Sequence, residues 1–329
     1  MDILVTVPGT GSRGGFFPAE TRERLESLGT VEWNETGDQF TESDLRERIP
    51  GVDVLVTGWG SPQVTASVVE AADDLSLVAH TGGSVADIAS EAAYDAGVRV
   101  VSANDEMARF VAEQTVAAVV AHRRRLPALD RAMRDGAWDA DVTIESLHGS
   151  SVGLVGLGTI GRHVLDHLAS WDVSVAVYDP YIDDEALADW PFASLAPLDD
   201  ALSSDVVSLH ASLTPETEGM VGEDELAHLP DGALFVNTAR AGLVEADAML
   251  AELRSGRLDA VLDVFHEEPL PEDHELRTLD NVLLTPHTGG SRIRAPLTES
   301  VLDDVERWQA GESLAHEISR EQWTLMTPV

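Results

Sequence analysis

The stretch that most constrains the fold runs from Ser150 to Ser170 and reads SSVGLVGLGTIGRHVLDHLAS. A short apolar run of strand type leads directly into the turn Gly156-Leu-Gly158-Thr-Ile-Gly161, and a helical pattern follows. At this spacing the first glycine permits a tight turn, the second lets the backbone approach a phosphate, and the third allows helix and strand to pack closely. The N–H groups at the helix start then face the anion. The stretch therefore predicts a parallel α/β domain that binds a dinucleotide.

The acid after the next strand bears on the choice of cofactor. That strand ends in Tyr178-Asp179-Pro180, eighteen residues beyond Gly161. A carboxylate about 20 residues after the turn accepts hydrogen bonds from the ribose hydroxyls and repels a 2′-phosphate, which favours NAD over NADP. Two alternatives stay open from these residues alone: a glycine turn with an incidental aspartate, and a site for another adenosine-containing ligand such as S-adenosylmethionine.

Strand-like and helical patterns alternate along the whole chain, which predicts α/β architecture with parallel sheets. The first series contains four strand-like runs (DILVTVP, DVLVTGW, LSLVAHTGG and VRVVSAN), and the second contains six. A helical tail from Arg292 is too short to be a domain, so we expect it to pack on the first series. The prediction is two Rossmann-like, doubly wound domains. A flavodoxin-like substrate domain comprises residues 1–103 and 289–329, and an NAD-binding Rossmann domain comprises residues 104–288.

The charge balance excludes several classes of partner. The 329 residues include 59 acids and 21 basic residues, all of them arginine, so that the formal net charge is −38. Such a surface repels nucleic acids and anionic membranes, and we expect neither as a partner. Without cysteine there is no disulfide, thiolate metal site or cysteine nucleophile. The chain has no basic leader segment, which predicts a cytoplasmic protein. The lysine-free, acid-rich composition resembles that of proteins from salt-accumulating halophiles, with an ordinary acidic cytoplasmic protein as the alternative.

Three strand ends in the second series carry residues suited to acid–base chemistry. Arg240 follows ALFVNTA, the segment Asp263–Glu268 follows LDAVL, and His287 follows VLLTP. Because the carboxyl ends of parallel strands share one edge of a sheet, these residues should converge. An arginine can bind a carboxylate through two hydrogen bonds, and a histidine exchanges protons near neutral pH. A carboxylate beside the histidine would keep it protonated, so the set suits reduction of a keto acid.

Ordered matches over nearly the whole chain extend this interpretation. They are VAEQTVAAVV (111–120), GLVGLGTIGR (153–162), YDPY (178–181), DVVSLHASLTPET (205–217), NTARAGLVE (237–245), LDVFHEEPLP (262–271) and NVLLTPHTGGS (281–291). With these segments the chain closely resembles the D-isomer-specific 2-hydroxyacid dehydrogenases, a family that includes phosphoglycerate, glyoxylate and D-lactate dehydrogenases. The resemblance implies an enzyme that interconverts a small 2-keto acid and its D-2-hydroxy acid with NAD(H).

The resemblance also implies roles for individual residues. Arg240 would bind and polarise the substrate, and His287 would be the general acid in reduction and the general base in oxidation. Glu268, directly before the proline of the DVF-x-x-EP segment, would pair with the imidazole and stabilise its charged form. Asp263 would face the nicotinamide carboxamide. The implied cofactor-binding residues are Gly156, Gly158, Thr159, Ile160, Gly161, Asp179, His210, Thr217, Thr238, Ala239, Asp263, His287 and Gly289.

For the substrate carboxylate, the family uses backbone amides of a glycine-containing loop in the first domain. The counterpart here is AHTGGSVAD, which makes Gly82, Gly83 and Ser84 substrate-binding candidates beside Arg240 and His287. This loop departs from the family, which commonly has GVGVDNID there. A second departure is Ala241, where the family usually has glycine.

Partners and rival functions follow from the same resemblance. The segment around Trp138 resembles the family's dimer contact, so a homodimer is expected, with a core position of Trp138 as the alternative. Formate-type oxidation is disfavoured because those relatives have glutamine at the position of Glu268. A cofactor-sensing, co-repressor-like binding protein would keep the same residues and stays open as an alternative. His266, Glu267 and His274 are metal ligands by type, but their loop lacks rigid spacing, and no metal is expected.

Overall fold

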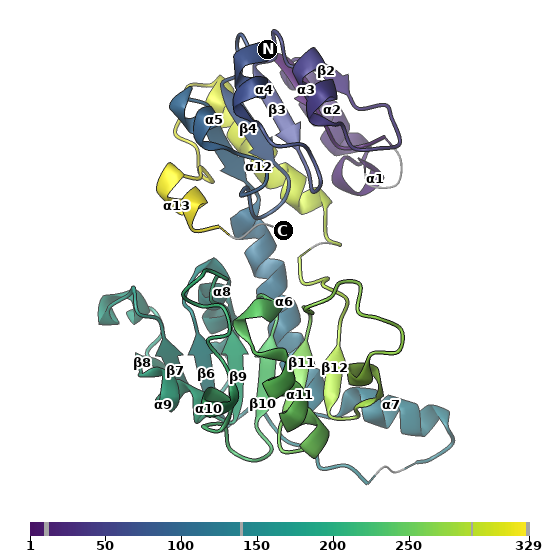
Figure 1. The fold of residues 1–329 in the computed structure, drawn as a ribbon, viewed down its shortest axis with the longest axis vertical. Helices are drawn as coiled ribbons and strands as arrows, with labels where there is room; N and C mark the ends of the chain where they lie inside the picture. Colours follow the sequence, from purple (N-terminus) through teal and green to yellow (C-terminus); the bar gives the residue numbers. More distant parts are fainter. Residues whose placement is uncertain (10–12, 139–140, 291, 327–329) are drawn as a thin grey trace. The chain divides into compact units, whose positions relative to one another are not determined.

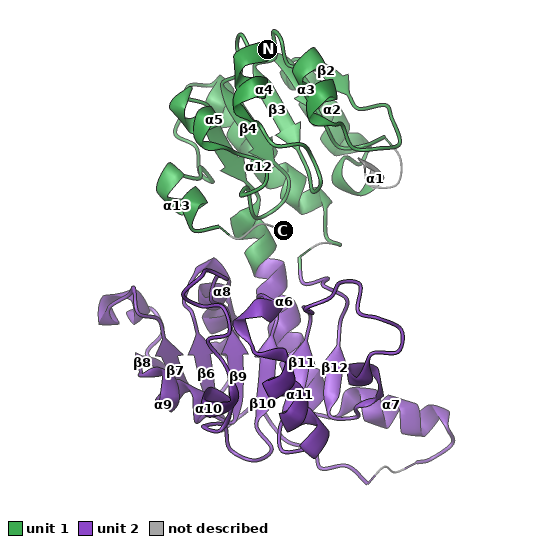
Figure 2. Ribbon diagram, viewed as in Figure 1, with its two compact units in different colours: residues 1–108, 290–329 green, residues 109–289 purple. Residues whose placement is uncertain are grey.

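The computed structural model describes residues 1–9, 13–138, 141–290 and 292–326 and divides into two compact units. Unit 1 comprises Met1–Ala108 and Gly290–Val329, and unit 2 comprises Arg109–Gly289 (Figure 2). Unit 1 is thus built from both ends of the chain. The first division falls five residues beyond the predicted limit at 103/104, inside a long helix, because that helix begins before the chain enters unit 2.

Unit 1 contains a five-stranded parallel sheet in the order β2-β1-β3-β4-β5 (Figure 1). In this flavodoxin-like order the chain reverses direction across the sheet between β1 and β3. The strands are β1 (Asp2–Val5), β2 (Thr30–Trp33), β3 (Val54–Thr57), β4 (Leu77–His80) and β5 (Arg99–Ser102). The helices are α1 (Arg13–Phe16), α2 (Ala19–Leu28), α3 (Glu42–Arg48), α4 (Ala66–Ala71), α5 (Glu91–Asp95), α12 (Ala295–Gln309) and α13 (Arg320–Thr324).

Unit 2 contains a seven-stranded parallel sheet in the order β12-β11-β10-β9-β6-β7-β8. The chain winds outward from β6 in both directions, so the topological switch point lies between β6 and β9. The strands are β6 (Ser151–Val155), β7 (Ser174–Tyr178), β8 (Ala193–Leu195), β9 (Val206–Leu209), β10 (Leu234–Asn237), β11 (Asp259–Leu262) and β12 (Val282–Leu284). The helices are α6 (Asn104–Arg123, which starts in unit 1), α7 (Leu126–Arg134), α8 (Thr159–Leu168), α9 (Leu198–Leu202), α10 (Glu223–Leu226), α11 (Ala246–Ser255), and the 3₁₀ turns η1 (Asp184–Leu187), η2 (Ala241–Leu243) and η3 (Glu275–Thr278).

The central strands are apolar on both faces because helices cover both sides of the sheet. In β10, Leu234 and Val236 belong to a core with residues of α6 and α8. Phe235, between them, belongs to the opposite core with residues of α10 and α11. All four residues of the strand are buried. This two-sided burial produces the continuous apolar runs that the sequence shows.

The strand register aligns the carboxyl ends of four neighbouring strands in unit 2. Leu209 pairs with Asn237, Asn237 with Leu262, and Leu262 with Leu284. The residues that follow these four therefore leave the sheet at one edge. This edge carries most of the residues predicted to be functional in unit 2.

The fold class predicted from the sequence is confirmed: both units are parallel-sheet α/β structures. The strand count was too low in each series, because β2 and β8 were not predicted. Both are edge strands with partly exposed side chains, so neither forms the apolar run that marks a buried strand. The tail helix α12 packs against β4, β5 and α2, as expected. Among the described residues, no helix combines the length and apolarity that crossing a membrane requires.

Candidate active site

The glycine turn after β6 satisfies a separate steric demand at each of its glycines. Gly156 has φ +94°, and a Cβ atom there would lie 2.6 Å from the backbone nitrogen of Ala211. A Cβ on Gly161 would lie 2.6 Å from the carbonyl oxygen of Gly156. At Gly158 a Cβ would meet nothing within 4 Å. Close backbone contacts thus require glycine at positions 156 and 161, while Gly158 leaves open space in front of the helix.

The start of α8 is suited to an anion. Gly158 is its N-cap residue and provides no side-chain cap, so the first N–H groups of the helix have no intrahelical acceptor. The first turn contains no acidic residue, although acids are abundant elsewhere in the chain. The helix start therefore offers N–H donors and the positive end of the helix dipole without a competing carboxylate.

Asp179 stands beside this turn. One carboxylate oxygen accepts a hydrogen bond from the N–H of Leu157 (2.8 Å), and the other accepts one from the N–H of Tyr181 (2.9 Å). Each oxygen keeps a second lone pair for another donor. The side chain is only partly buried, so the carboxylate is oriented by the backbone and open to a ligand.

His210 follows β9, next to the glycine turn across the switch point. Its backbone N–H donates to the carbonyl of Val155 (2.7 Å), and its ring nitrogen Nε2 lies 2.9 Å from the hydroxyl of Ser208. Burial lowers the pKa of His210 to about 4, so the ring is neutral at physiological pH. Its buried Nδ1 has no hydrogen-bond partner among the described residues. A buried ring nitrogen without a partner is uncommon and would be satisfied by a ligand group at this edge.

Other predicted cofactor residues hold local structure. The Thr217 hydroxyl donates to the carbonyl of Ser212 (2.6 Å) and accepts from the N–H of Thr214 (2.8 Å), which fixes the turn after β9. The Thr238 hydroxyl is buried against that of Thr115 at 2.9 Å. Ala239 is buried, and Thr159 and Ile160 form the first turn of α8.

Arg240 leaves the sheet directly after β10. The Asn237 side chain accepts from the N–H of Ala239 (3.1 Å) and donates to the carbonyl of Arg240 (2.9 Å), so it braces this turn. The guanidinium donates to the carbonyl of Ala239 at 2.8 Å. Burial lowers the pKa of Arg240, and the negative charge of Glu268 opposes that shift. Since an arginine side chain keeps its proton in proteins, the group is a partly desolvated cation.

Asp263, directly after β11, is almost completely buried. One of its carboxylate oxygens accepts from the hydroxyl of Thr285 (2.5 Å) and the N–H of Thr288 (3.0 Å), and the other accepts from the N–H of Gly289 (3.0 Å). Its backbone carbonyl accepts from the N–H of His287 at 2.8 Å. Asp263 therefore holds the 285–289 loop against β11. Its predicted contact with the nicotinamide carboxamide stays a prediction.

His287 and Glu268 form a pair on the loops after β12 and β11. Imidazole Nδ1 lies 2.7 Å from one carboxylate oxygen of Glu268, and the other oxygen accepts from the N–H of Phe265 at 2.9 Å. Both side chains are partly exposed. Burial raises the pKa of Glu268, but the hydrogen bonds from His287 and Phe265 and the charges of His287 and Arg240 outweigh it, so the pKa is lowered. The carboxylate is charged at neutral pH, and Nδ1 must be the donor.

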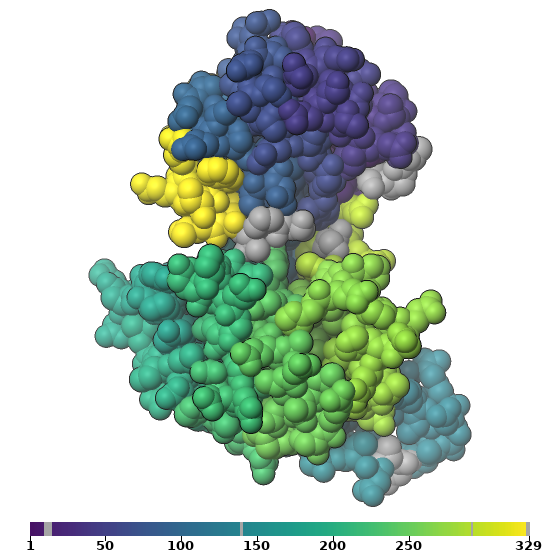
Figure 3. Space-filling view, in the orientation of Figure 1, coloured from purple at the N-terminus to yellow at the C-terminus, as the bar shows by residue number. Residues whose placement is uncertain are grey.

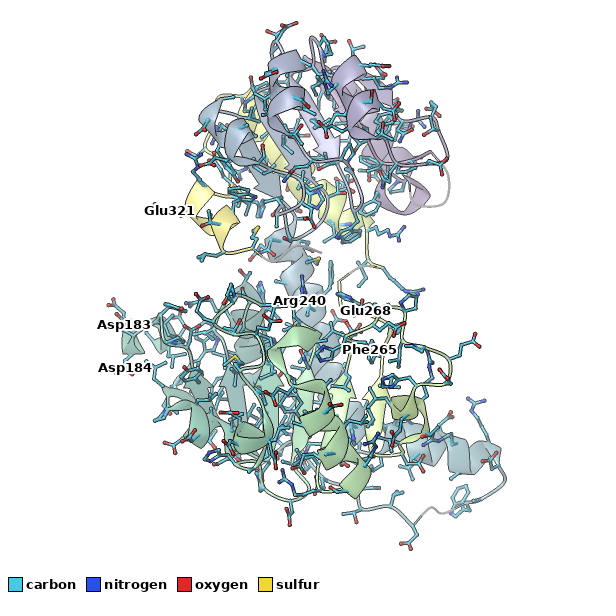
Figure 4. All side chains as sticks on the ribbon, in the orientation of Figure 1. Asp183, Asp184, Arg240, Phe265, Glu268 and Glu321 are labelled. Atoms are coloured by element: carbon cyan, nitrogen blue, oxygen red, sulfur yellow. The ribbon has the colours of Figure 1, made fainter. Side chains whose placement is uncertain are left out.

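The three catalytic candidates thus lie together in unit 2. Figure 4 labels Arg240, Phe265 and Glu268 at the edge where β10 and β11 end. The charges of Arg240 and Glu268 interact, and His287 is bonded to Glu268. One guanidinium, one carboxylate and one imidazole at this edge can bind an anion and exchange a proton.

The glycine loop after β4 lies in unit 1. A Cβ on Gly82 would lie 2.5 Å from His80 Nε2, and one on Gly83 would lie 2.1 Å from the Met107 methyl carbon, so neither position accepts a side chain without rearrangement. Both glycines are buried, and their N–H groups donate to no acceptor in the part of the chain that the structure describes. Buried N–H groups without an acceptor are rare and suit an anionic ligand. The Ser84 hydroxyl accepts from the N–H of Ala86 at 3.3 Å.

Residues 116–289 match the family model described as D-isomer specific 2-hydroxyacid dehydrogenase, NAD binding domain. This match covers more than half of the chain and lies within unit 2. The chain belongs to the D-isomer specific 2-hydroxyacid dehydrogenases.

Named relatives and a solved structure agree with the membership in this dehydrogenase family. The chain is 36% identical over 271 residues to D-3-phosphoglycerate dehydrogenase of Methanocaldococcus jannaschii, covering 81% of this chain and 51% of that protein, so it spans about half the length of that relative. It is 32% identical over 265 residues to hydroxypyruvate reductase of Thermotoga maritima, covering 79% of this chain and 85% of that protein. The crystal structure of the TT0316 protein from Thermus thermophilus superimposes with a TM-score of 0.79 at 29% identity, covering 97% of this chain and 100% of that one.

Three supporting residues of the candidate site were not found from the sequence: Asn237, Phe265 and Thr285. Asn237 could have been found because it is a polar residue at the end of the buried run LFVN. Nothing marks Phe265, because it acts through its backbone N–H. The rejected metal ligands have other partners: His266 Nε2 donates to the carbonyl of Val244 (3.1 Å), and His274 Nδ1 accepts from the N–H of Leu276 (3.2 Å). The described residues contain no group of three or more side chains able to hold a metal ion.

Replacing Glu268 with glutamine should change the pH dependence of 2-keto acid reduction with NADH. The neutral amide lacks the negative charge that Glu268 places beside the imidazole, so the pH above which the rate declines should fall. Rates measured from pH 5 to 10 at saturating NADH check this. Glu267→Gln, at the adjacent exposed position, is the matched control and should leave the profile unchanged. An unaltered profile in Glu268→Gln would contradict a functional pairing with His287.

Proposed function

We propose that this chain is an NAD-dependent dehydrogenase that interconverts a 2-keto acid and its D-2-hydroxy acid by hydride transfer. The observation that carries the proposal is the Glu268–His287 pair, with Nδ1 and carboxylate oxygen 2.7 Å apart and the charge of Arg240 acting on the same carboxylate. Two relatives, a D-3-phosphoglycerate dehydrogenase and a hydroxypyruvate reductase, support it.

The cofactor would accept the hydride in oxidation and donate it in reduction. The residues fit NAD(H) because Gly158 leaves space before an uncapped helix and the Asp179 carboxylate has acceptor capacity to spare. In the proposal, Thr159, Ile160 and Gly161 at the start of α8 bind the pyrophosphate and Asp179 binds the adenosine ribose. The remaining proposed contacts are Gly156, His210, Thr217, Thr238, Ala239, Asp263, His287 and Gly289.

Arg240 and His287 would act on the substrate itself. A partly desolvated guanidinium binds a carboxylate and draws electron density from the adjacent carbonyl. His287, with Nδ1 bonded to Glu268, gives its Nε2 proton to the carbonyl oxygen in reduction and takes it from the hydroxyl in oxidation. Glu268 keeps the ring oriented and balances its charge. The N–H groups of Gly82 and Gly83, with Ser84, would bind the substrate carboxylate.

A panel of 2-keto acids tests the activity. NADH absorbance is followed with glyoxylate, hydroxypyruvate, pyruvate and bulkier 2-keto acids, and chiral analysis identifies the product. We expect turnover of at least one acid, a D-2-hydroxy product, and loss of about 10²- to 10⁴-fold in rate in His287→Ala. Folded protein that binds NADH and turns over none of them would contradict the enzyme and favour a cofactor-sensing binding protein.

Asp179→Asn removes the charge of this carboxylate and keeps one of its two hydrogen bonds from the backbone. The amide oxygen can still accept from Leu157, but the negative charge that repels a 2′-phosphate is gone. The affinity for NADH should fall by about tenfold, and the ratio of the affinity for NADH to that for NADPH should decrease. Fluorescence titration with both cofactors measures this, and Asp184→Asn, at an exposed acid nearby, is the control. Equal discrimination by Asp179→Asn and the unsubstituted protein would contradict the assignment.

We also propose a cytoplasmic enzyme adapted to high salt. The 59 acids outnumber the 21 arginines, so most acids repel one another without a basic counterpart. Molar salt screens this repulsion, because the Debye length falls to about 3 Å at 1 M. The midpoint of thermal unfolding should therefore rise from dilute buffer to multimolar KCl. Equal or greater stability in dilute buffer would contradict salt adaptation.

A homodimer is proposed from the segment around α7. None of the α7 side chains is buried, and four of the seven large exposed hydrophobic residues in the described part of the chain lie at positions 126–144. They are Leu126, Met133, Trp138 and Ile144. The space-filling view shows this segment standing out from the body of unit 2 (Figure 3). Sedimentation equilibrium should give twice the mass of one chain.

Met133→Asp and Trp138→Ala should shift this equilibrium toward the monomer. Tyr181→Ala, at a position that is 89% exposed outside this segment, is the control and should not. A monomeric unsubstituted protein, or a dimer unaffected by both changes, would contradict this interface.

A further inference from the structure

An apolar pocket of about 280 Å³ lies in unit 2, beside the segment after β11 that carries Glu268. Its lining includes Phe235 and Leu262 of the sheet, Met249 and Leu250 of α11, and Phe265 and Leu270 from the segment after β11. Its volume is near the lower end of that of small-molecule sites, about 300 Å³. None of the residues proposed to hold NAD(H) or the 2-keto acid lines it. The pocket is therefore distinct from the proposed cofactor and substrate contacts.

The pocket touches the supports of two catalytic residues. Phe265 lines it, and its backbone N–H holds the Glu268 carboxylate at 2.9 Å (Figure 4). Asn237 lines it as well, and its side chain donates to the carbonyl of Arg240 at 2.9 Å. A molecule that shifts either lining residue would shift a hydrogen bond to the catalytic edge. The two residues are contributed by β10 and by the loop after β11, so one occupant reaches both.

The charges of the lining select the kind of occupant. Most of the lining is apolar, but it includes the exposed carboxylates of Asp247 and Glu267 and no arginine. The ring of His266 is committed through Nε2 to the carbonyl of Val244. The lining also contains His274, whose Nδ1 accepts from the N–H of Leu276. An anion would meet two carboxylates and no arginine, whereas a cation would find two carboxylate acceptors beside an apolar interior.

We propose that this pocket binds a small hydrophobic cation, an amine with an aromatic or branched aliphatic group, as an effector of the enzyme. The apolar group fills the space over Phe235 and Met249, and the ammonium group lies between Asp247 and Glu267. Occupancy changes turnover through Phe265 and Asn237. Binding is independent of the proposed function, and only the effect on turnover rests on it.

Three probes of similar size and different charge test the binding. They are 2-phenylethylamine, the neutral 2-phenylethanol and the anionic phenylacetate. Each is titrated into the full-length protein with NADH by calorimetry, at the lowest KCl concentration that keeps it folded. The amine should bind about two- to five-fold more tightly than the alcohol, and the acid most weakly. No binding of the amine, or equal binding of all three, would overturn the proposal.

Variants locate the site. Ala246 is exposed and lies on the pocket lining at the start of α11, so Ala246→Phe should block the pocket without disturbing a core. Ala227→Phe, at an exposed position at the end of α10 that is not on the lining, is its control. Asp247→Asn with Glu267→Gln should remove the preference for the amine, whereas Asp224→Asn should not. Amine binding that survives both Ala246→Phe and the double charge change would place the site elsewhere.

Turnover gives the readout for the effector role. With saturating amine, kcat/KM for the best 2-keto acid should change at least about two-fold in the unsubstituted protein and not in Ala246→Phe. Binding with the predicted charge preference but without any change in kcat or KM would overturn the effector role. Absence of turnover with every 2-keto acid would instead contradict the proposed function, because the binding measurements do not depend on catalysis.

Discussion

The geometry of the site depends on the hydrogen bonds that the buried carboxylate of Asp263 accepts. It accepts three hydrogen bonds from Thr285, Thr288 and Gly289, and its backbone carbonyl accepts the N–H of His287. This set ties the end of β12 to the end of β11. His287 adopts φ +49°, a backbone conformation that costs free energy in a residue other than glycine and persists only where surrounding contacts impose it. Asp263 provides those contacts, and the imidazole can therefore meet Glu268 from the neighbouring loop. A carboxylate predicted to contact the cofactor supports, in the structure, the loop that carries His287.

The parallel sheet explains why much of this could be predicted from the sequence. Strands buried on both faces must be apolar runs, so β6, β9, β10 and β11 were recognisable. The edge strand β12 is only partly buried but was recognised because its sequence is an apolar run. The in-register pairing of Leu209, Asn237, Leu262 and Leu284 then brings whatever follows them to one edge. Glycine positions were equally readable, because at Gly156 and Gly161 a Cβ would collide with backbone atoms. Arg240, Glu268 and His287 were named as candidates because each stands just beyond such a strand, although only the family resemblance distinguished Glu268 from Glu267.

What the sequence did not reveal depends on contacts that leave no pattern. The edge strands β2 and β8 are partly exposed, so no apolar run marks them in the sequence. They are strands because they pair with the neighbouring strand of the sheet. Phe265 supports Glu268 through a backbone N–H, which every residue but proline possesses. Asn237 acts on Arg240 through a turn three residues long, where the side chain direction is fixed only after β10 is placed. The apolar pocket likewise exists because α11, the strands β10 and β11 and the 265–276 segment fold around one space.

The central claim is that Glu268, as a charged acceptor, fixes the proton of His287 on Nδ1 and leaves proton exchange to Nε2. Long-range ¹H–¹⁵N correlation spectra of the ¹⁵N-histidine-labelled protein test this directly, with His287→Gln identifying the signals. The account predicts a protonated Nδ1 in both the charged and the neutral ring, with Nε2 alone losing its proton as the pH rises. A neutral His287 ring with an unprotonated Nδ1 would contradict it.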